Sequence, residues 1–162
     1  MDISIHIAGD DDVDALANLR RAWNEENAGG RIDDDGFDGA FAEWWKAERL
    51  SRTFFLVMVD GSAVGMVNVK RYDRMPAAGH STGGLWGYVG NMFVVAQHRN
   101  SGVGRALMEG LIAWAGQAGM DHLRLAPSPL SNPFYARLGF VPGAVVELSS
   151  NRVTPTPAAR PL

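Results

Sequence analysis

A short glycine-containing loop, residues 99–104, joins an apolar run to a stretch with helical periodicity. The run before it, residues 88–95, is typical of a strand, and residues 103–118 repeat apolar side chains on one helical face. The first N–H groups of a helix have no partner inside the helix, and the helix dipole adds positive charge there. Glycine lets the backbone approach an anion closely. The order strand, loop, helix therefore predicts a cradle for a phosphate or diphosphate group.

Two well-known kinds of diphosphate loop fit this stretch poorly. A P-loop ends in Gly-Lys-Ser/Thr, but Gly104 is followed by Arg105. A dinucleotide-binding loop needs a third glycine where this chain has Leu107, and its carboxylate would be Asp121, which comes late. A nicotinamide-linked oxidoreductase therefore stays open only as a weaker alternative.

Length and composition indicate a soluble globular chain. The 162 residues are 46% apolar and 20% charged, which suits one domain with a sizeable core. No run approaches the ~20 apolar residues of a membrane helix, and residues 1–4 carry no basic flank of a secretory signal. We therefore expect a cytoplasmic protein with no membrane partner.

The absence of cysteine narrows the chemistry. It removes disulfides, thiolate metal sites and a cysteine nucleophile. The four histidines show no metal-ligand spacing, so we expect no metal.

Charge is distributed unevenly along the chain. Residues 1–50 hold 13 acidic and 5 basic residues, whereas residues 51–162 hold 5 acidic and 10 basic ones. The basic part contains the predicted phosphate loop, and the acidic part either lines a site for a cationic partner or forms helix caps and solvated turns. No dense basic patch is interleaved with aromatic residues, so nucleic acid is not an expected partner.

Periodicity predicts an α+β fold, an α/β arrangement in three layers. Hairpin-joined strands followed by strand–helix–strand units imply a mixed, mostly antiparallel central sheet flanked by helices. We expect one domain over residues 1–148 and a Pro-containing tail over residues 149–162. The predicted strands are residues 3–7, 53–59, 63–69, 85–95 and 122–126, with one or two more in 140–141 and 145–148. The first predicted helix begins after Asp12 and ends near residues 27–30, and the other three cover residues 37–50, 103–118 and 132–138.

Two segments together resemble the GNAT-type N-acetyltransferase superfamily. Residues 89–104 are similar to that family's strand ending in an apolar triplet, followed by Arg/Gln-x-x-Gly-x-Gly/Ala at a helix start. Residues 132–140, Asn-Pro-Phe-Tyr-Ala-Arg-Leu-Gly-Phe, resemble a second family segment that carries Asn, Phe-Tyr and a closing Gly-Phe. The resemblance covers residues 53–140 and implies a GNAT-like acyl-CoA N-acyltransferase fold. It also implies acetyl-CoA as co-substrate and a small-molecule or peptide amine as acceptor. The acidic character of residues 1–50 suggests that this acceptor is cationic.

The resemblance assigns roles to individual residues. Backbone around Met92, Phe93 and Val94 would pair with the pantetheine arm, and one N–H there would polarise the thioester carbonyl. Tyr135 would protonate the leaving thiolate, which suits a phenol of ordinary pKa ~10. The residues expected to bind the donor are Met92, Phe93, Val94, Arg99, Asn100, Ser101, Gly102, Val103, Gly104, Arg105 and Asn132.

The base that would deprotonate the amine is left open. Many family members carry a glutamate where this chain has Gly90. His80 is the candidate taken as catalytic because imidazole titrates near neutral pH; Asp73, Glu25 and Glu26 are alternatives, directly or through water. A non-catalytic acyl-CoA sensor of the same fold is the second hypothesis for function. Val145, Val146 and Leu148 form either a homodimer edge or the end of the sheet.

Overall fold

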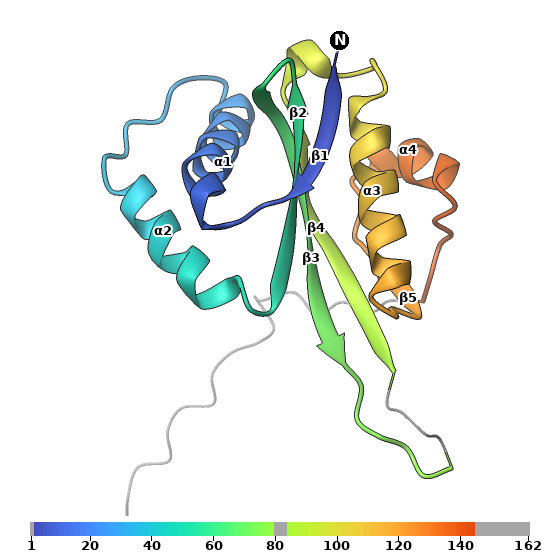
Figure 1. Ribbon diagram of the computed structural model, residues 1–162. Helices are drawn as coiled ribbons and strands as arrows, with labels where there is room; N and C mark the ends of the chain where they lie inside the picture. Colours follow the sequence, from blue (N-terminus) through green and yellow to red (C-terminus); the bar gives the residue numbers. More distant parts are fainter. Residues whose placement is uncertain (1, 80–83, 145–162) are drawn as a thin grey trace, which may run out of the picture.

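A sheet in the order β1-β2-β3-β4-β5 lies between two layers of helices in the computed structural model (Figure 1). The structure describes residues 2–79 and 84–144. The strands are β1 (Ile3–Ile7), β2 (Arg52–Val59), β3 (Ser62–Asp73), β4 (Leu85–Val94) and β5 (His122–Arg124); the helices are α1 (Val13–Ala28), α2 (Phe37–Glu48), α3 (Val103–Gln117) and α4 (Asn132–Arg137); short 3-10 turns are η1 (Asp10–Asp12), η2 (Ala96–His98) and η3 (Pro129–Ser131).

The strand directions confirm the predicted mixed, mostly antiparallel sheet. β1 to β4 pair antiparallel in sequence order, and β5 returns through α3 to lie parallel to β4. Asp60 and Gly61 close the β2–β3 hairpin, both with positive φ (48° and 81°), as a two-residue type I′ turn requires. No helix in the described ranges is both long and apolar enough to cross a membrane.

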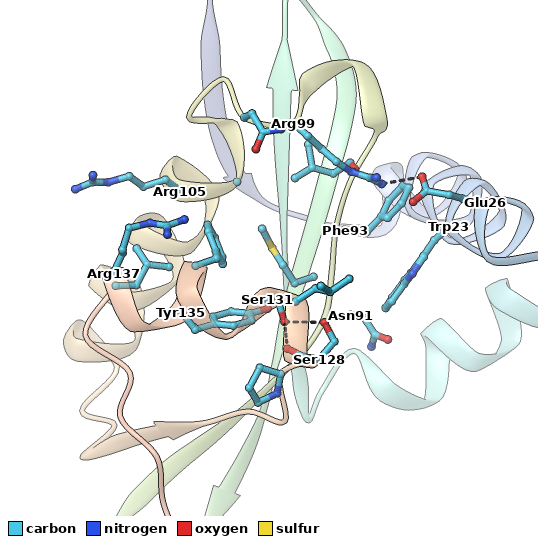
Figure 2. A pocket seen from close by; sticks show the side chains of 18 of the residues that line it. Trp23, Glu26, Asn91, Phe93, Arg99, Arg105, Ser128, Ser131, Tyr135 and Arg137 are labelled. Atoms are coloured by element: carbon cyan, nitrogen blue, oxygen red, sulfur yellow. Dashed lines mark hydrogen bonds and ion pairs between the residues drawn. The ribbon is translucent and has the colours of Figure 1, made fainter.

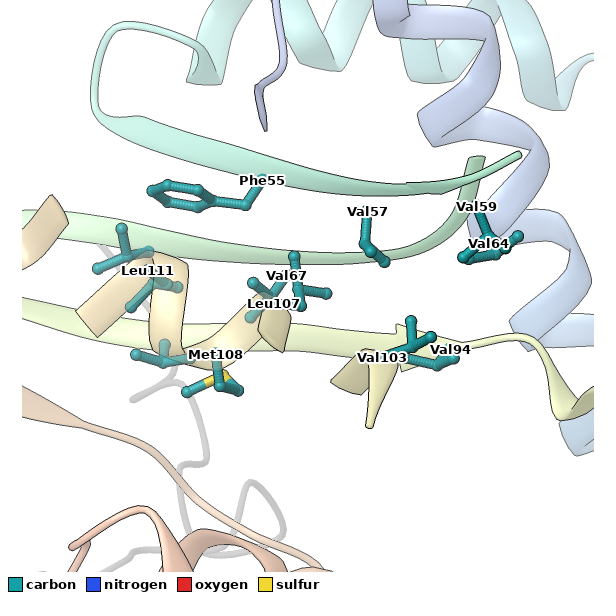
Figure 3. Close-up of a cluster of buried hydrophobic side chains, with 12 residues drawn as sticks. Phe55, Val57, Val59, Val64, Val67, Val94, Val103, Leu107, Met108 and Leu111 are labelled. Carbon is teal, nitrogen blue, oxygen red and sulfur yellow. The ribbon is translucent and has the colours of Figure 1, made fainter. Parts of the chain in front are cut away.

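Alternation along the strands divides the apolar side chains between two cores. Phe54 and Leu56 of β2 face the layer of α1 and α2, whereas Phe55 and Val57 face α3 (Figure 3). Leu107 and its neighbours on α3 are fully buried against that second face. Since both faces of β2, β3 and β4 are covered, these strands read as continuous apolar runs.

The C-terminal part differs from the expectation. The strand predicted over 122–126 ends at Arg124, and the strand predicted at Phe140 and Val141 is wrong, because these residues adopt no regular structure. The Phe140 N–H donates to the Tyr135 carbonyl at 3.1 Å, so it closes α4 instead of joining a ladder. Residues 145–148, the domain boundary at 148 and the tail at 149–162 lie outside the described residues and stay predictions.

Close packing of β2, β3 and β4 makes Gly65 sensitive to substitution. A Cβ there would lie 2.8 Å from the Phe93 carbonyl oxygen and 3.0 Å from side-chain atoms of Val57 and Val94. We expect Gly65→Ala to lower the free energy of unfolding by about 1–3 kcal/mol, measured by urea denaturation.

Gly116 provides the matched control for that substitution. It lies inside α3, and a Cβ there would meet nothing within 4 Å. Gly116→Ala should raise the free energy of unfolding by about 0.5–1 kcal/mol. Equal effects of the two substitutions would contradict the packing described at Gly65.

Candidate active site

The gap between β4 and β5 creates the principal cavity of the described structure. β5 pairs with β4 only at Trp86, Gly87 and Tyr88. Beyond Tyr88, β4 continues to Val94 with β3 on one side and, among the described strands, no partner on the other. A cavity of about 1120 Å³ opens along this edge and is lined by β4, α1, α3, α4 and the segment before α4 (Figure 2).

A β-bulge turns the edge of β4 toward this cavity. Met66 pairs with Phe93 and Asn68 with Gly90, so Asn91 and Met92 of β4 stand opposite the single residue between them on β3. Asn91 has φ 54°, a left-handed conformation that is uncommon for residues other than glycine. A bulge interrupts the ladder and re-aims backbone and side chains. Residues 91–94 all line the cavity, and an unpaired strand edge can hydrogen-bond an extended ligand.

The N-terminus of α3 lies at one end of the cavity. Gly102 precedes the helix with φ 88°, and no side chain caps the first turn, so its N–H groups are available to a ligand. Asn100, Gly102, Gly104 and Arg105 line the cavity. A Cβ at Gly104 would lie 3.2 Å from the Met92 Cε atom, so glycine allows α3 to approach β4 closely.

The charges around the cavity favour an anion. Arg99, Arg105 and Arg137 line it, against the carboxylate of Glu26. The Arg99 side chain donates from Nε to the Val94 carbonyl and from Nη2 to Glu26 Oε2, each at 2.7 Å. Arg105 donates from Nε to the Glu109 carboxylate at 2.7 Å on the exposed side of α3. The balance of charged side chains is therefore positive, as a phosphate-bearing ligand requires.

Tyr135 reaches the cavity from α4, opposite Trp23 of α1 (Figure 2). Its ring packs edge-on against Phe134 and Phe140, with centroids 5.0 and 5.8 Å away. Burial raises the pKa of the Tyr135 phenol above its ordinary value. The hydroxyl is therefore protonated at neutral pH and able to donate a proton into the cavity.

The structure brings most of the candidate donor-binding residues together. Met92, Phe93, Val94, Arg99, Asn100, Gly102, Gly104 and Arg105 line the same cavity as Tyr135. The Val103 side chain is fully buried in the core, and the Ser101 hydroxyl donates to the His98 carbonyl at 2.7 Å. Asn132 begins α4 but is outside the described lining.

Of the candidate bases, Glu26 alone lies in the described lining of the cavity. Asp73 pairs with Arg71 at 3.4 Å at the end of β3, and Glu25 accepts the Ile32 N–H at 3.1 Å. His80 lies outside the described residues. Where the described side chains are concerned, no group of three or more His, Asp and Glu is placed to hold a metal ion.

The position of Gly90 has room for a side chain. A Cβ there would meet only Asn68 Oδ1 and Tyr88 Cε1, both at 3.9 Å, so packing does not demand glycine. Asn68 is fully buried and accepts a hydrogen bond from Arg52 at 2.9 Å. Hydrogen bonds from Lys70 and Arg52 hold the pKa of the nearby Glu48 carboxyl below its ordinary value, which makes it a poor proton acceptor.

The acidic residues that suggested a cationic acceptor have local partners in several cases. Asp38 pairs with Arg21 at 3.3 Å, and Asp34 accepts the Gly36 N–H at 3.0 Å. These residues surround a second hollow of about 740 Å³ beside the loop between α1 and α2. A cationic acceptor stays a prediction.

Several lining residues were missed by the sequence analysis. Trp23 was not singled out as a site residue; its ring stacks on Phe93, with the centroids 5.8 Å apart, and also lines the cavity. Of these residues, only Asn91 could have been noticed from the sequence, because it is a polar residue that follows glycine and interrupts an apolar strand. Ser128 and Ser131, whose hydroxyls lie 3.0 Å apart, follow no pattern that the sequence exposes.

The five-stranded mixed sheet, with α1 and α2 packed on one face and α3 on the other, defines a class of protein, the acyl-CoA N-acyltransferase fold. The model of the Acetyltransferase (GNAT) family matches residues 15–140, so the chain belongs to that family. This confirms the predicted resemblance. Among curated proteins, none is significantly similar to this chain in sequence.

Solved structures share the fold at low sequence identity. A predicted acetyltransferase with acetyl-CoA from Clostridium acetobutylicum is 18% identical, with a TM-score of 0.72 over 93% of this chain and 98% of that one. Glucosamine-6-phosphate N-acetyltransferase from Arabidopsis thaliana is 13% identical, with a TM-score of 0.72 over 92% and 98%. An aminoglycoside acetyltransferase from an uncultured soil metagenomic sample is 16% identical, with a TM-score of 0.69 over 92% and 97%.

Gly102 tests the role of the α3 N-terminus. Gly102→Asp puts a carboxylate where an anion is expected and forces a side chain onto left-handed backbone. We expect acetyl-CoA affinity, measured by calorimetry, to fall by about tenfold or more. The control is Gly61→Asp, which has similar φ (81°) in the β2–β3 turn. An equal loss in both variants would refute the assignment of the cradle.

Proposed function

We propose that this chain is an acyl-CoA-dependent N-acetyltransferase that moves the acetyl group of acetyl-CoA to a primary amine by direct attack. The observation that carries the proposal is the meeting of three features in one cavity. These are the bulged edge of β4, the uncapped N-terminus of α3 and the protonated phenol of Tyr135. Membership of the GNAT family supports the reaction class. A cytoplasmic location belongs to the same proposal.

The donor is held by backbone and by cations in this proposal. The first N–H groups of α3, with Asn100 and Gly102 before them, bind the diphosphate, and Arg105 and Arg137 add positive charge. The edge of β4 at residues 92–94 pairs with the pantetheine amides as an added strand would. Ser101 and Val103 contribute through their backbone, and Asn132, at the start of α4, contacts the pantetheine arm.

The chemistry divides between β4 and α4. The neutral amine attacks the thioester carbon, and negative charge develops on the carbonyl oxygen. The nitrogen, positively charged once the bond has formed, loses one proton to solvent, and this balances the proton that the leaving sulfur receives. An N–H group of the bulge, near Met92 or Phe93, donates to that oxygen. As the carbon–sulfur bond breaks, Tyr135 gives its proton to the departing sulfur. No covalent intermediate with the protein is needed, which agrees with a chain that has no cysteine.

Tyr135→Phe tests the proton donor. We expect kcat to fall by about a hundredfold, while the acetyl-CoA dissociation constant stays within twofold, because only the hydroxyl is lost. In the parent chain the phenol donates below its raised pKa and loses this ability as pH rises through it. The rate supported by Tyr135 should therefore persist above pH 10 before it falls.

The control is Tyr72→Phe, on an exposed tyrosine that stacks on Trp86 away from the cavity. It should leave kcat unchanged. Release of free thiol, followed with a panel of polyamines, aminoglycosides, amino acids and peptide N-termini, identifies the amine and tests the expectation of a cationic acceptor. Binding of acetyl-CoA without turnover of any amine would favour the sensor hypothesis. A thermal shift with NAD but none with coenzyme A would overturn the proposal.

A further inference from the structure

The Arg99 side chain already has hydrogen-bond partners within the structure. Its Nε binds the Val94 carbonyl, its Nη2 binds Glu26 Oε2, and its guanidinium carbon lies 5.6 Å from the centre of the Phe93 ring. The side chain therefore contacts three parts of the fold: the end of β4, the core under α1 and the last turns of α1. It does not extend freely toward the N-terminus of α3.

Glu26 is the carboxylate that opposes the cations of the described cavity lining. It lies on α1 beside Trp23 and Asn27, the two other α1 residues of the lining, across the cavity from Tyr135 (Figure 2). Its side chain is 43% exposed and that of Arg99 is 39% exposed. An ion pair with this much solvent contact is worth about 0.2–1 kcal/mol, so a stronger anion can displace the carboxylate.

We propose that Glu26 is an acceptor-binding residue whose carboxylate is released by the donor. A diphosphate at the N-terminus of α3 draws Arg99 toward itself and repels Glu26. The freed carboxylate, between Trp23 and Asn27, accepts a hydrogen bond from the N–H of a primary amine. This inference rests on the proposed function, and it adds one binding group for the amine, which the donor makes available.

The pair explains why one carboxylate lies among the cations of a diphosphate site. Without the donor, Glu26 neutralises Arg99, and its Oε2 atom is engaged by the guanidinium. With the donor, the same oxygen becomes available. Coupling of this kind is reciprocal, so a bound amine that holds Glu26 must also favour the donor.

Glu26→Gln separates the two roles. The variant removes the competition for Arg99, so acetyl-CoA and coenzyme A should bind about two- to fivefold more tightly by calorimetry. It also removes the charged hydrogen bond to the amine, so kcat/KM for the amine should fall by about tenfold or more. Arg99→Gln should have the opposite effect on the donor: it should weaken acetyl-CoA binding and leave the KM for the amine unchanged.

Glu43→Gln is the matched control, since Glu43 pairs with Lys46 at 2.6 Å on the exposed face of α2. It should change neither affinity nor rate. Weaker acetyl-CoA binding in both Glu26→Gln and Arg99→Gln, or no change in the former, would overturn the inference and leave a purely structural ion pair. If the parent chain bound no acetyl-CoA, the proposed function itself would fail first.

Discussion

The separation of β4 from β5 beyond Tyr88 is the constraint on which the rest of the site depends. Every strand edge in a sheet offers N–H and C=O groups that need partners. Here β3 pairs with one side of β4 through a ladder that is bulged at Asn91 and Met92, and beyond Tyr88 no described strand pairs with the other side. The uncapped N-terminus of α3, which follows β4 in the chain, lines the same cavity. An unpaired strand edge and a helix N-terminus thus border one opening.

The two cores hold this opening in shape from opposite sides. Phe93 belongs to the core under α1 and α2, while its neighbour Val94 belongs to the core under α3. Met92 contacts the α3 core and also lines the cavity. This edge of β4 is therefore anchored on both faces, as the hydrogen-bond donor proposed near Met92 or Phe93 would require, because a fixed donor needs little reorganisation in the transition state.

The sequence predicted the mixed sheet and its flanking helices because these follow from periodicity. Two local motifs pointed to Tyr135 and the 99–104 loop, which the structure brings to one cavity, while their roles in binding and catalysis stay predictions. It did not predict that Arg99 turns toward Glu26, because the two are 73 positions apart in the sequence and nothing local signals their contact. The bulge at Asn91 was missed for a similar reason: its left-handed φ depends on the register with β3.

Tyr135, the proposed proton donor, stands on the shortest α-helix of the described fold. α4 has six residues, too few to be stable alone, and its shape depends on Phe134, Tyr135 and Phe140 packing against one another and the core. The aromatic cluster is at once the scaffold of the helix and the surroundings of the reacting hydroxyl. A smaller side chain at Phe140 would consequently loosen α4 and also reduce the burial that raises the pKa of Tyr135.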